Sequence, residues 1–366
     1  MFKVLKKSKL SKARLGLIKT AHGAIETPFF MPDATRGAVK YLSGQELEKL
    51  GLKCMVANTL HLFLRPGVKL IKQAGGLHNF INWPGLILSD SGGYQIFSLL
   101  HKNQRAGQIT DQGAKFKSPV DGSGLELTPE QSIKAQFDLG VDMMVCFDDC
   151  PPNDYADGKI KIAVERTIKW AERCAREFKK QIKARRLKRP PLLFAVIQGG
   201  HNQALRKYCA QELIKIGFDG YGFGARHIDS GGNFMAGILR RTASLISEDK
   251  LRFGLGIGTP EDIIKAIRLG WDMFDCVIPT REGRHGRLYL RKRQTINITN
   301  AKFARDFSPI NADSRLAELK NYSKAYLHYL FKISEPLAAR LASLNNLEFY
   351  LKLLSEAREL IKKDKL

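Results

Sequence analysis

Two aspartates of this 366-residue chain stand in surroundings that suit paired carboxylate chemistry. Asp90 lies in the segment SDSGGYQ, and Asp275 lies in FDCVIPTREGRHGR. A carboxylate such as Asp275 could attack the anomeric carbon of a nucleoside as its base departs, while a second carboxylate transfers the proton. Retaining glycosidases divide the work between two carboxyl groups in this way. Asp275 is therefore a candidate nucleophile.

The residues around Asp90 could also hold a flat ligand. Ser91, Gly92 and Gly93 leave backbone amides open to a closely approaching planar group. Asp148 in CFDDCPP and Gln198 in VIQGG add hydrogen-bonding groups, and a carboxylate accepts well from the N1–H and 2-amino donors of guanine. Tyr94 could stack on the face of the base, and packing in the core is an equally good interpretation of that residue.

A basic segment directly follows Asp275. Arg281, Arg284, His285 and Arg287 alternate with glycines there and would bind the phosphates that flank a reacting nucleotide. A structural cluster of salt bridges is the alternative. The whole chain carries 60 Lys and Arg against 36 Asp and Glu, a net charge of +24 that attracts polyanions such as nucleic acid. A solvated, lysine-rich surface would give the same total.

Eight short apolar runs recur along the chain, and amphipathic or polar stretches separate them. They are residues 29–34, 54–59, 86–91, 143–148, 192–197, 220–224, 252–257 and 273–278. Runs that are apolar on both faces suit parallel strands covered by helices. Thr128-Pro129 and Thr259-Pro260 are helix-start signals between the runs. The pattern predicts an α/β fold, a (β/α)8 TIM barrel with its active site at the carboxyl ends of the strands.

Polar residues and glycines stand at the ends of these runs. They are Asp33, Asn58, Asp90, Asp148, Gln198, Gly224, Gly258 and Asp275. Ordinary turn chemistry explains any one of them, because Asp, Asn and Gly often follow strands. Asp90, Asp148, Gln198 and Asp275 together favour a catalytic mouth instead.

Four further segments surround the expected barrel. A hairpin turning at His22-Gly23 precedes it, and residues 94–127, with a hairpin turning at Asp121-Gly122, follow the third strand. Residues 160–190 form a long helix with a basic end, which could follow phosphates or be a solvated tail. We expect a catalytic domain at 1–304 and a helical subdomain packed on it at 305–366.

Six scattered cysteines, at 54, 146, 150, 174, 209 and 276, have no CxxC spacing. The basic start of the chain lacks the apolar core of a signal peptide, and no apolar run approaches the roughly 20 residues that span a bilayer. We therefore expect reduced thiols, a cytoplasmic protein and no membrane association.

The motifs in which these residues lie resemble those of the bacterial tRNA-guanine transglycosylases, also called queuine tRNA-ribosyltransferases. The resemblance covers SDSGGYQIFSL, FDDCPP, VIQGG, GIGTPED and MFDCVIPTREGRHG, in order and spacing, and also NTLHLFLRPG and NYSKAYLHYLFK. It implies a TIM barrel with a C-terminal helical subdomain, and no cofactor. It implies that a tRNA anticodon loop is the partner and that the wobble guanine is exchanged for a 7-deazaguanine, queuine or its precursor.

The resemblance also assigns roles to residues. Asp275 would form the covalent link to ribose, and Asp90 would be the general acid and base. Base-binding residues would be Ser91, Gly92, Gly93, Tyr94, Asp148, Cys150, Gln198, Gly224, Ala225 and Leu255. RNA-binding residues would be Gly256, Ile257, Gly258, Thr259, Pro260, Glu261, Asp262, Thr280, Arg281, Glu282, Gly283 and Arg284.

Two departures from the family pattern carry expectations of their own. The family binds a structural zinc ion at positions that are Ser314, Leu316, Leu319 and Asn345 here, so no metal is expected, and the homodimer that the family builds in that region is left open. The family segment GGLxVGE, which reads the aminomethyl group of the incoming base, is 224–230 here, with Ser230 in place of its carboxylate. Either Asp229 substitutes for that carboxylate or the preferred base differs.

Three other functions compete with base exchange in tRNA. A paralogue could insert a deazaguanine into DNA or another RNA with the same catalytic residues. A non-catalytic RNA-binding subunit would have no need for two buried, acidic residues. An unrelated barrel glycosidase acting on sugars fits poorly with the segment TREGRHGR and the charge of +24.

Overall fold

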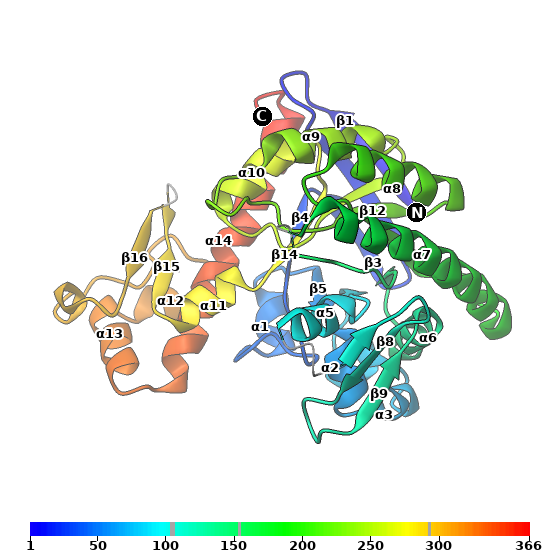
Figure 1. The fold of residues 1–366 in the computed structure, drawn as a ribbon. Coiled ribbons are helices and arrows are strands. Elements are labelled where there is room, and N and C mark those ends of the chain that lie inside the picture. The colour runs from blue at the N-terminus through cyan, green and yellow to red at the C-terminus, as the bar shows by residue number, and fades with distance from the viewer. Residues whose placement is uncertain (103–106, 153–154, 292–293) are drawn as a thin grey trace.

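The computed structural model describes residues 1–102, 107–152, 155–291 and 294–366, and its centre is an eight-stranded parallel sheet (Figure 1). The strands neighbour one another in the order β4, β14, β13, β12, β11, β10, β6 and β5. Their bounds are β4 (Phe29–Pro32), β5 (Cys54–Ala57), β6 (Leu86–Ser89), β10 (Met143–Val145), β11 (Leu192–Ile197), β12 (Gly220–Phe223), β13 (Leu251–Gly254) and β14 (Met273–Cys276). Each strand lies within or overlaps one of the eight apolar runs, so the predicted barrel is confirmed.

A bridge between the two outermost strands closes the sheet into a barrel. Asp33 and Val56 pair in parallel there, and the amide of Ala34 donates to the carbonyl of Val56 at 2.7 Å. On its other side, β4 pairs with β14 so that Met31 lies opposite Asp275. The carboxyl ends of all eight strands therefore meet around one rim.

Alternate residues of the strands fill the interior of the barrel. This inner core includes Phe29, Met31, Val56, Leu88, Val196, Phe253 and Met273. Since side chains alternate between the two faces of a strand, the residue two places further along also faces inward. For five strands these next residues are Asp33, Asn58, Asp90, Gln198 and Asp275. The inward-facing side chains are therefore apolar inside the barrel and polar at its rim.

A three-stranded antiparallel sheet lies before the barrel. β2 (Arg14–Thr20) and β3 (Gly23–Thr27) form the predicted hairpin around His22. β1 (Phe2–Lys7) extends this sheet beside β2 and was not predicted. Its side chains alternate between half-buried and exposed, so its sequence, FKVLKK, carries only a weak apolar signal.

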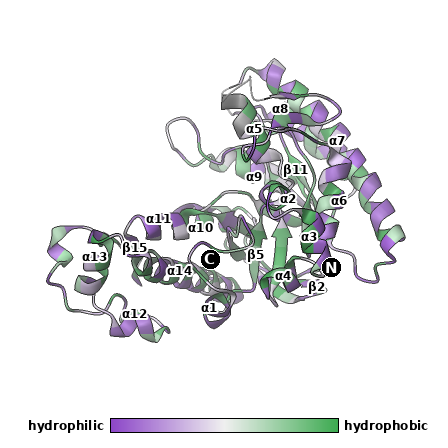
Figure 2. Ribbon diagram, turned by 90° about the horizontal axis from the view of Figure 1, so that it is seen from below, coloured by the Kyte–Doolittle hydropathy of each residue, from purple (hydrophilic) through white to green (hydrophobic). Residues whose placement is uncertain are grey.

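Helices cover the outside of the barrel. They include α1 (Gly44–Lys49), α6 (Pro129–Leu139), α7 (Asp157–Arg185), α8 (Gln203–Ile216), α9 (Ala236–Leu245) and α10 (Pro260–Arg268). Thr128 and Thr259 cap α6 and α10 as predicted, and each accepts a backbone hydrogen bond from the third residue that follows it. Figure 2 shows mixed hydrophilic and hydrophobic colours along α7, which is the long predicted helix. Within the described residues, none of the helices has the length and apolarity to cross a bilayer.

The connections around β6 are longer than a simple barrel needs. Three short helices, α2 (Thr59–Leu64), α3 (Val68–Gln73) and α4 (Leu77–Ile81), precede β6. After it come α5 (Gly93–Lys102) and the antiparallel strands β7 (Gly107–Ile109), β8 (Ala114–Lys117) and β9 (Gly124–Leu127). The predicted hairpin corresponds to β8 and β9, whereas α5 and β7 were not predicted. Residues 103–106 of this insertion lie outside the described part of the chain.

The end of the chain forms a projection and then returns to the barrel (Figure 1). The projection holds α11 (Ile278–Arg284), β15 (Arg287–Tyr289), β16 (Thr295–Asn297), the 3-10 helix η3 (Ala301–Phe303), α12 (Ala317–Asn321) and α13 (Lys324–Lys332). The last helix, α14 (Pro336–Lys362), packs on α11 and also on β4. The ring of Tyr350 lies 4.9 Å from that of Phe30, so α14 covers the barrel as well as the projection. A domain boundary at 304/305 stays a prediction.

Candidate active site

Four donors hold the carboxylate of Asp90 at the mouth of the barrel. Oδ1 accepts hydrogen bonds from the backbone amides of Thr59 at 2.9 Å and Gly92 at 3.1 Å. Oδ2 accepts from the side-chain amides of Asn58 at 2.6 Å and Gln95 at 3.1 Å. Asn58 caps α2 and Gln95 lies in the first turn of α5, so the starts of two helices fix this carboxylate.

Burial nevertheless raises the pKa of Asp90 to about 6, and the neighbouring charge of Asp33 acts in the same direction. The four donors oppose this rise because they favour the ionised form. A carboxyl group with a pKa in this range can hold and release a proton near neutral pH, which is the requirement for a general acid and base.

Asp275 lies on β14 and is held much more loosely. Its Oδ1 accepts one hydrogen bond, from the amide of Gly256 at 2.9 Å, and its Oδ2 has no hydrogen-bond partner among the described residues. Burial raises the pKa of Asp275 to about 7, and the charges of Asp33 and Asp90 add to the effect. The structure thus brings the two predicted catalytic aspartates into one electrostatic cluster and leaves one oxygen of Asp275 open.

Asp148 and Gln198 meet in the floor of the same site. The side-chain amide of Gln198 donates to Oδ2 of Asp148 at 2.7 Å, and both side chains are buried. Burial raises the pKa of Asp148 to about 7, with contributions from the charges of Asp149 and Asp90. The buried Oε1 of Gln198 has no partner among the described residues, which leaves an acceptor for a ligand.

Glycine at position 224 keeps this floor open. A Cβ atom there would lie 2.5 Å from the side-chain amide carbon of Gln198. The next residue, Ala225, has a φ of 81°, which is unusual for a residue with a side chain. Cys150 lies beside Asp148, and burial raises the pKa of its thiol to about 12, so the thiol stays protonated. Leu255 is half-buried against Gly222 on the neighbouring strand.

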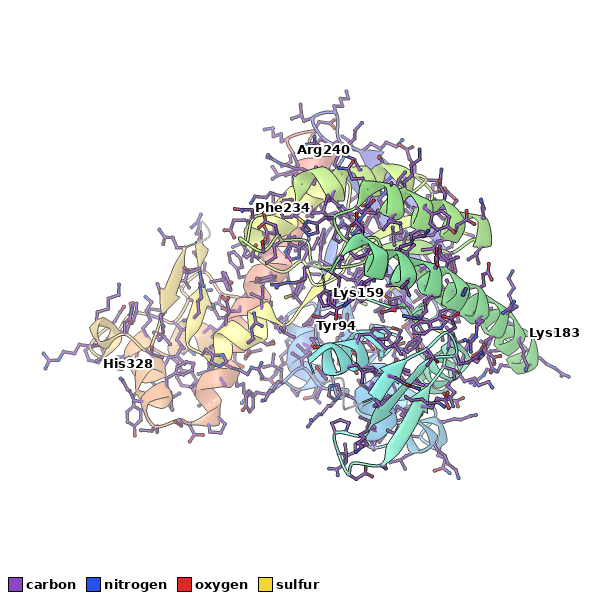
Figure 3. The ribbon with its side chains drawn as sticks, in the orientation of Figure 1. Tyr94, Lys159, Lys183, Phe234, Arg240 and His328 are labelled. Carbon is purple, nitrogen blue, oxygen red and sulfur yellow. The ribbon has the colours of Figure 1, made fainter. Side chains whose placement is uncertain are left out.

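The segment after Asp90 turns sharply to enter α5. Gly92 has a φ of 79°, and a Cβ atom on it would lie 3.2 Å from Leu60. The hydroxyl of Ser91 accepts from the amide of Gly93 at 3.2 Å and holds the turn. Tyr94 at the start of α5 is 61% exposed (Figure 3), so its interpretation as a core residue is wrong. It is free to contact a ligand.

The predicted RNA segment 256–262 is partly structural. Ile257, Gly258 and Pro260 are buried, and the carbonyl of Gly258 accepts a hydrogen bond from the Tyr350 hydroxyl at 2.6 Å. Thr259 accepts from the amide of Asp262 at 3.2 Å and caps α10. Gly256 and Glu261 are exposed, and they are the members of this segment most accessible to a ligand.

In the second RNA segment, 280–284, the two arginines remain available. Thr280 and Gly283 are buried, and Glu282 accepts from the hydroxyl of Tyr289 at 2.6 Å. Arg281 is exposed, and Arg284 donates to the carbonyl of Thr280 at 3.1 Å. Neither arginine forms an ion pair with a described residue. Of the four basic residues that follow Asp275, only Arg287 forms an ion pair, with Glu282 at 3.4 Å, so the salt-bridge interpretation fails for Arg281 and Arg284.

The loop after β12, which departs from the family pattern, folds on itself. Asp229 accepts from the amide of Asn233 at 2.8 Å and from its side chain at 3.2 Å. Ile228 and Phe234 form an antiparallel bridge across this turn. Ser230 at its tip is exposed. The carboxylate of Asp229 is therefore engaged by its own turn.

The four positions that hold zinc in the family do not fit a zinc ion here; they are Ser314, Leu316, Leu319 and Asn345. Both leucines are buried in the core. The hydroxyl of Ser314 donates to Glu348 at 2.5 Å, and Asn345 accepts from the side chain of Asn311 at 2.9 Å. Hydrogen bonds therefore join the loop before α12 to α14 at the place where the family uses a metal.

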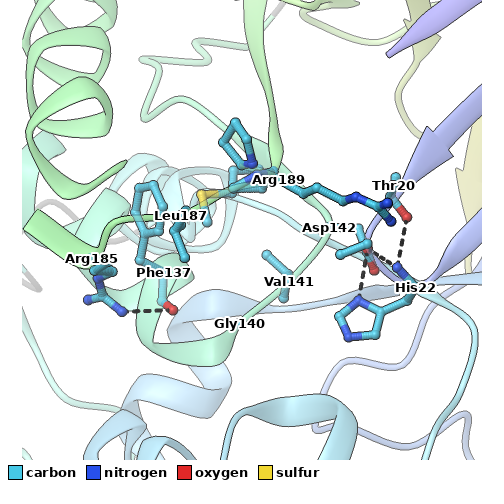
Figure 4. Close-up of a pocket in the computed structure, with 13 residues that line it drawn as sticks. Thr20, His22, Phe137, Gly140, Val141, Asp142, Arg185, Leu187 and Arg189 are labelled. Carbon is cyan, nitrogen blue, oxygen red and sulfur yellow. Dashed lines mark hydrogen bonds and ion pairs between the residues drawn. The ribbon is translucent and has the colours of Figure 1, made fainter. Parts of the chain in front are cut away.

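A cavity of about 150 Å³ lies at the opposite, amino-terminal end of the barrel (Figure 4). Asp142 on its wall accepts from His22 Nδ1 at 2.9 Å and from the amide of Ile87 at 3.0 Å, and its Oδ2 lies 3.2 Å from His78 Nε2. Burial opposes ionisation, but hydrogen bonds from His78, Ile87 and His22 lower the pKa of Asp142 to about 2. Because active sites of such barrels lie at the other end, we interpret this group as structural.

Three residues of the mouth were missing from the predicted site. The sequence indicates Asp33 and Asn58 only as strand ends, and it gives no role to Gln95. The signal for Asn58 and Asp33 was alternation, since each follows an inward-facing core residue by two places. Gln95 could be found only by knowing that a helix starts at Gly93 and directs its first turn back at Asp90.

Comparison with known proteins gives one consistent family. A family model described as "Queuine tRNA-ribosyltransferase" matches residues 8–366. Queuine tRNA-ribosyltransferase of Thermoanaerobacter pseudethanolicus is 43% identical over 365 residues, which are 100% of this chain and 94% of that protein. The protein of the same name from Staphylococcus haemolyticus is 41% identical over 362 residues, 99% of this chain and 92% of that protein. This chain therefore belongs to the queuine tRNA-ribosyltransferase family.

Proposed function

We propose that this chain is a tRNA-guanine transglycosylase, a pentosyltransferase that exchanges the wobble guanine of tRNA for a 7-deazaguanine in the queuosine pathway. Its relatives carry the name of that activity. The observation that carries the proposal is the cluster of Asp90 and Asp275, two half-buried carboxyl groups with raised pKa values at the mouth of one barrel. Raised pKa values at such a site are typical of catalysis.

In the first half of the reaction, Asp275 is the nucleophile. Its open oxygen forms a bond to C1′ of the wobble nucleotide while the bond from C1′ to N9 of guanine breaks. The electron pair of that bond leaves with the base. Asp90 gives its proton to the departing purine, so that guanine leaves as a neutral molecule.

The second half reverses these roles. The incoming 7-deazaguanine gives its N9 proton to the carboxylate of Asp90, and N9 then attacks C1′. The ester bond to Asp275 breaks and its carboxylate is restored. Two displacements at the same carbon leave the configuration of the ribose unchanged.

The remaining predicted residues would bind the base and the RNA. Ionised Asp148 accepts from N1–H and the 2-amino group of guanine, and the free acceptor of Gln198 adds a further contact. Tyr94 would stack on the base, since its ring is exposed beside the site. Arg281 and Arg284 would bind the flanking phosphates, since neither has an ion-pair partner in the described part of the chain.

Exchange of radiolabelled guanine into bulk tRNA tests the activity. Asp275→Asn should abolish both exchange and the covalent RNA–protein adduct, because an amide cannot form the ester. Asp249→Asn, a change at an exposed loop before β13, is the matched control and should exchange normally. An adduct at wild-type yield in Asp275→Asn would refute the nucleophile assignment.

The same assay separates the competing functions. A DNA hairpin with the anticodon-loop sequence, and an unrelated structured RNA, replace tRNA in parallel reactions. Incorporation into DNA alone would identify the paralogue, and no incorporation without an added partner protein would identify a non-catalytic subunit. We expect incorporation into tRNA by this chain alone.

The identity of the incoming base is tested by competition. Ser230 replaces the family's carboxylate, and the carboxylate of Asp229 is engaged with Asn233. We therefore expect the aminomethyl precursor to compete with radiolabelled guanine no better than queuine does. Strong preference for the precursor would instead assign Asp229 or another group to its cationic substituent.

We also propose a homodimer and a cytoplasmic location. Exposed aromatic side chains on and beside α13, namely Tyr322, Tyr326 and Tyr329, support a surface for a second copy. All six cysteines are free, as expected for a reducing compartment. Sedimentation of the wild type and of Tyr329→Glu tests the dimer; equal masses that both correspond to one chain would refute it.

A further inference from the structure

Asp33 is a fourth carboxyl group at the mouth of the barrel, beside Asp90, Asp148 and Asp275, and the proposed reaction does not use it. It follows the inward-facing Met31 by two residues at the end of β4. On one side of β4 lies β14, where Asp275 pairs with Met31. On the other side Asp33 itself pairs with Val56 on β5. Asp33 therefore lies on the strand next to the nucleophile and faces the same space.

The electrostatic effects of Asp33 agree with this position. Its charge raises the pKa of both Asp275 and Asp90. The positive charge of the Arg284 guanidinium favours the ionised form of Asp33. Asp33 thus lies among the nucleophile, the acid–base group and one of the arginines that face the RNA.

The contacts of Asp33 leave half of its carboxylate unused. Oδ1 accepts a hydrogen bond from the hydroxyl of Thr35 at 2.6 Å. Thr35 also favours ionised Asp33 through its backbone amide, and no other described residue donates to this carboxylate or forms an ion pair with it, although the side chain is half-buried. Asp33 is not among the fully buried polar atoms that lack a partner, so its carboxylate is open to water and to a ligand. A ligand hydroxyl can therefore take the place of water as its donor.

The position that the proposed reaction gives to the nucleotide indicates which donor lies near the carboxylate of Asp33. Under the proposed function, the base lies at the arc of the barrel formed by β10, β11 and β12, where Asp148, Gln198 and Gly224 lie. The ribose carbon must reach Asp275 on β14. The 2′-hydroxyl is attached to the carbon next to C1′, so it lies within a few ångströms of the nucleophile. On the arc that runs from β14 to β6 without crossing the base site, Asp33 is the first inward-facing polar side chain.

We propose that Asp33 accepts a hydrogen bond from the 2′-hydroxyl of the reacting nucleotide and thereby makes the chain select ribose over deoxyribose at that position. The inference rests on the proposed function, because it takes the ribose position from the attack by Asp275. Hydrogen bonds to the hydroxyl beside the reacting carbon strengthen in transition states of this type. The 2′-hydroxyl is also the group by which proteins distinguish RNA from DNA.

The test uses two anticodon stem-loop RNAs that differ only by a 2′-deoxy sugar at the wobble guanosine. The measured quantity is the ratio of kcat/KM for the ribose substrate to that for the deoxyribose substrate. We expect the wild type to show a ratio of about 10 to 100, the size expected for a hydrogen bond to a charged group. In Asp33→Val the ratio should fall at least tenfold, because only the ribose substrate loses a contact. Asp33→Asn, which keeps an acceptor without the charge, should be intermediate.

Three controls make the ratio interpretable. Asp249→Ala changes an aspartate far from the mouth and should keep the wild-type ratio. A deoxy sugar at the nucleotide before the wobble position should give a ratio that Asp33→Val does not alter. Comparing ratios between variants also cancels the intrinsic difference in reactivity of the two sugars.

Two results would overturn the inference. One is an unchanged ratio in Asp33→Val together with a loss of activity toward both sugars, which would mean that Asp33 acts only through the charge of Asp275. The other is an unchanged ratio in Asp33→Val with unchanged activity toward both sugars, which would mean that Asp33 does not contact the ribose. Failure of the proposed function is distinct, since the wild type would then exchange guanine into neither RNA. Thermal unfolding of each variant identifies misfolding, and Asp33→Asn, with nearly the shape of aspartate, then carries the test.

Discussion

The two aspartates that we propose as catalytic differ most in how many donors hold them. Asp90 accepts four hydrogen bonds and cannot turn without breaking them. Asp275 accepts one and keeps an oxygen open. A proton-transfer group benefits from a fixed position, whereas a nucleophile must not have its attacking lone pairs occupied. The hydrogen-bond pattern alone therefore supports the division of roles.

The pKa values of the same residues predict how the reaction depends on pH. Asp275 must be ionised to attack, and its pKa is about 7, so activity should fall as pH decreases below that value. Asp90 must be protonated to release guanine, and its pKa is about 6, so activity should fall as pH increases above that value. We expect a bell-shaped profile of kcat/KM with its maximum between about pH 6 and 7.

Steady-state exchange of guanine from about pH 4.5 to 9 measures this profile. The profile of Thr35→Val is compared with that of the wild type. This substitution removes the hydroxyl that donates to Asp33 and favours its ionised form, while Asp90 and Asp275 stay in place. A profile that is flat from pH 5 to 8 would contradict the assignment of both groups.

At the scale of elements, the barrel could be predicted because its strands are buried on both faces. Runs such as LLFAVI at 192–197 are apolar throughout and coincide with β11. Most runs extended past the ends of their strands, as at β4, β6 and β10, where the last residues leave the strand and lie at the mouth of the barrel. The strand ends were therefore harder to predict than the strand centres, because the residues of the mouth follow the strands directly.

Elements that depend on long-range contacts could not be predicted. β15 and β16 are three residues each and carry mixed polarity. Asn346 on α14 donates to the carbonyl of Arg287 and accepts from the amide of Tyr289, so it holds β15 at both ends. Nothing near residues 287–289 in the sequence signals that partner. Gln95 was missed for the same reason, since its role depends on where α5 points.

The hydrogen bonds that replace the family's zinc ligands give a prediction about stability. Glu348 accepts from the hydroxyl of Ser314 at 2.5 Å and from the amide of Arg315 at 2.6 Å. Glu348→Ala leaves both donors without a partner and should lower the free energy of unfolding by about 1–3 kcal/mol. Urea denaturation measures the change. Glu356→Ala, at an exposed position of the same helix, is the control and should be nearly neutral.

The same experiment repeated with a chelator tests the absence of a structural metal. Ser314 and Asn345 are engaged by protein partners, and Leu316 and Leu319 offer no ligand atom. The unfolding midpoint should therefore be the same with and without EDTA. A chelator-induced loss of stability that disappears on adding zinc would refute this account.

At the scale of the whole molecule, α14 connects the projection to the barrel. Asn346 binds β15, while Tyr350, one turn later, donates to Gly258 at the mouth and packs on Phe30 of β4. One helix thus fixes the basic segment after Asp275 relative to the carboxylates at the mouth of the barrel. The arginines of α11 are positioned by this helix, since Gly283 packs directly against the backbone of Ala342.

Arg284 of α11 acts on Asp33 at the mouth, so under the proposed function a defined part of the net charge of +24 is placed to bind RNA there. Each phosphate contact contributes about −0.7 to the slope of log K against log salt for single-stranded RNA. Arg281→Ala should therefore weaken tRNA binding and make the slope less steep by about 0.7, as measured by filter binding from 50 to 300 mM salt. Lys183 lies at the exposed basic end of α7 (Figure 3). If that end is a solvated tail, Lys183→Ala should change neither the affinity for tRNA nor the slope. Equal effects of both substitutions would mean that tRNA extends along α7, and no effect of Arg281→Ala would refute the assignment of α11 as the phosphate-binding segment.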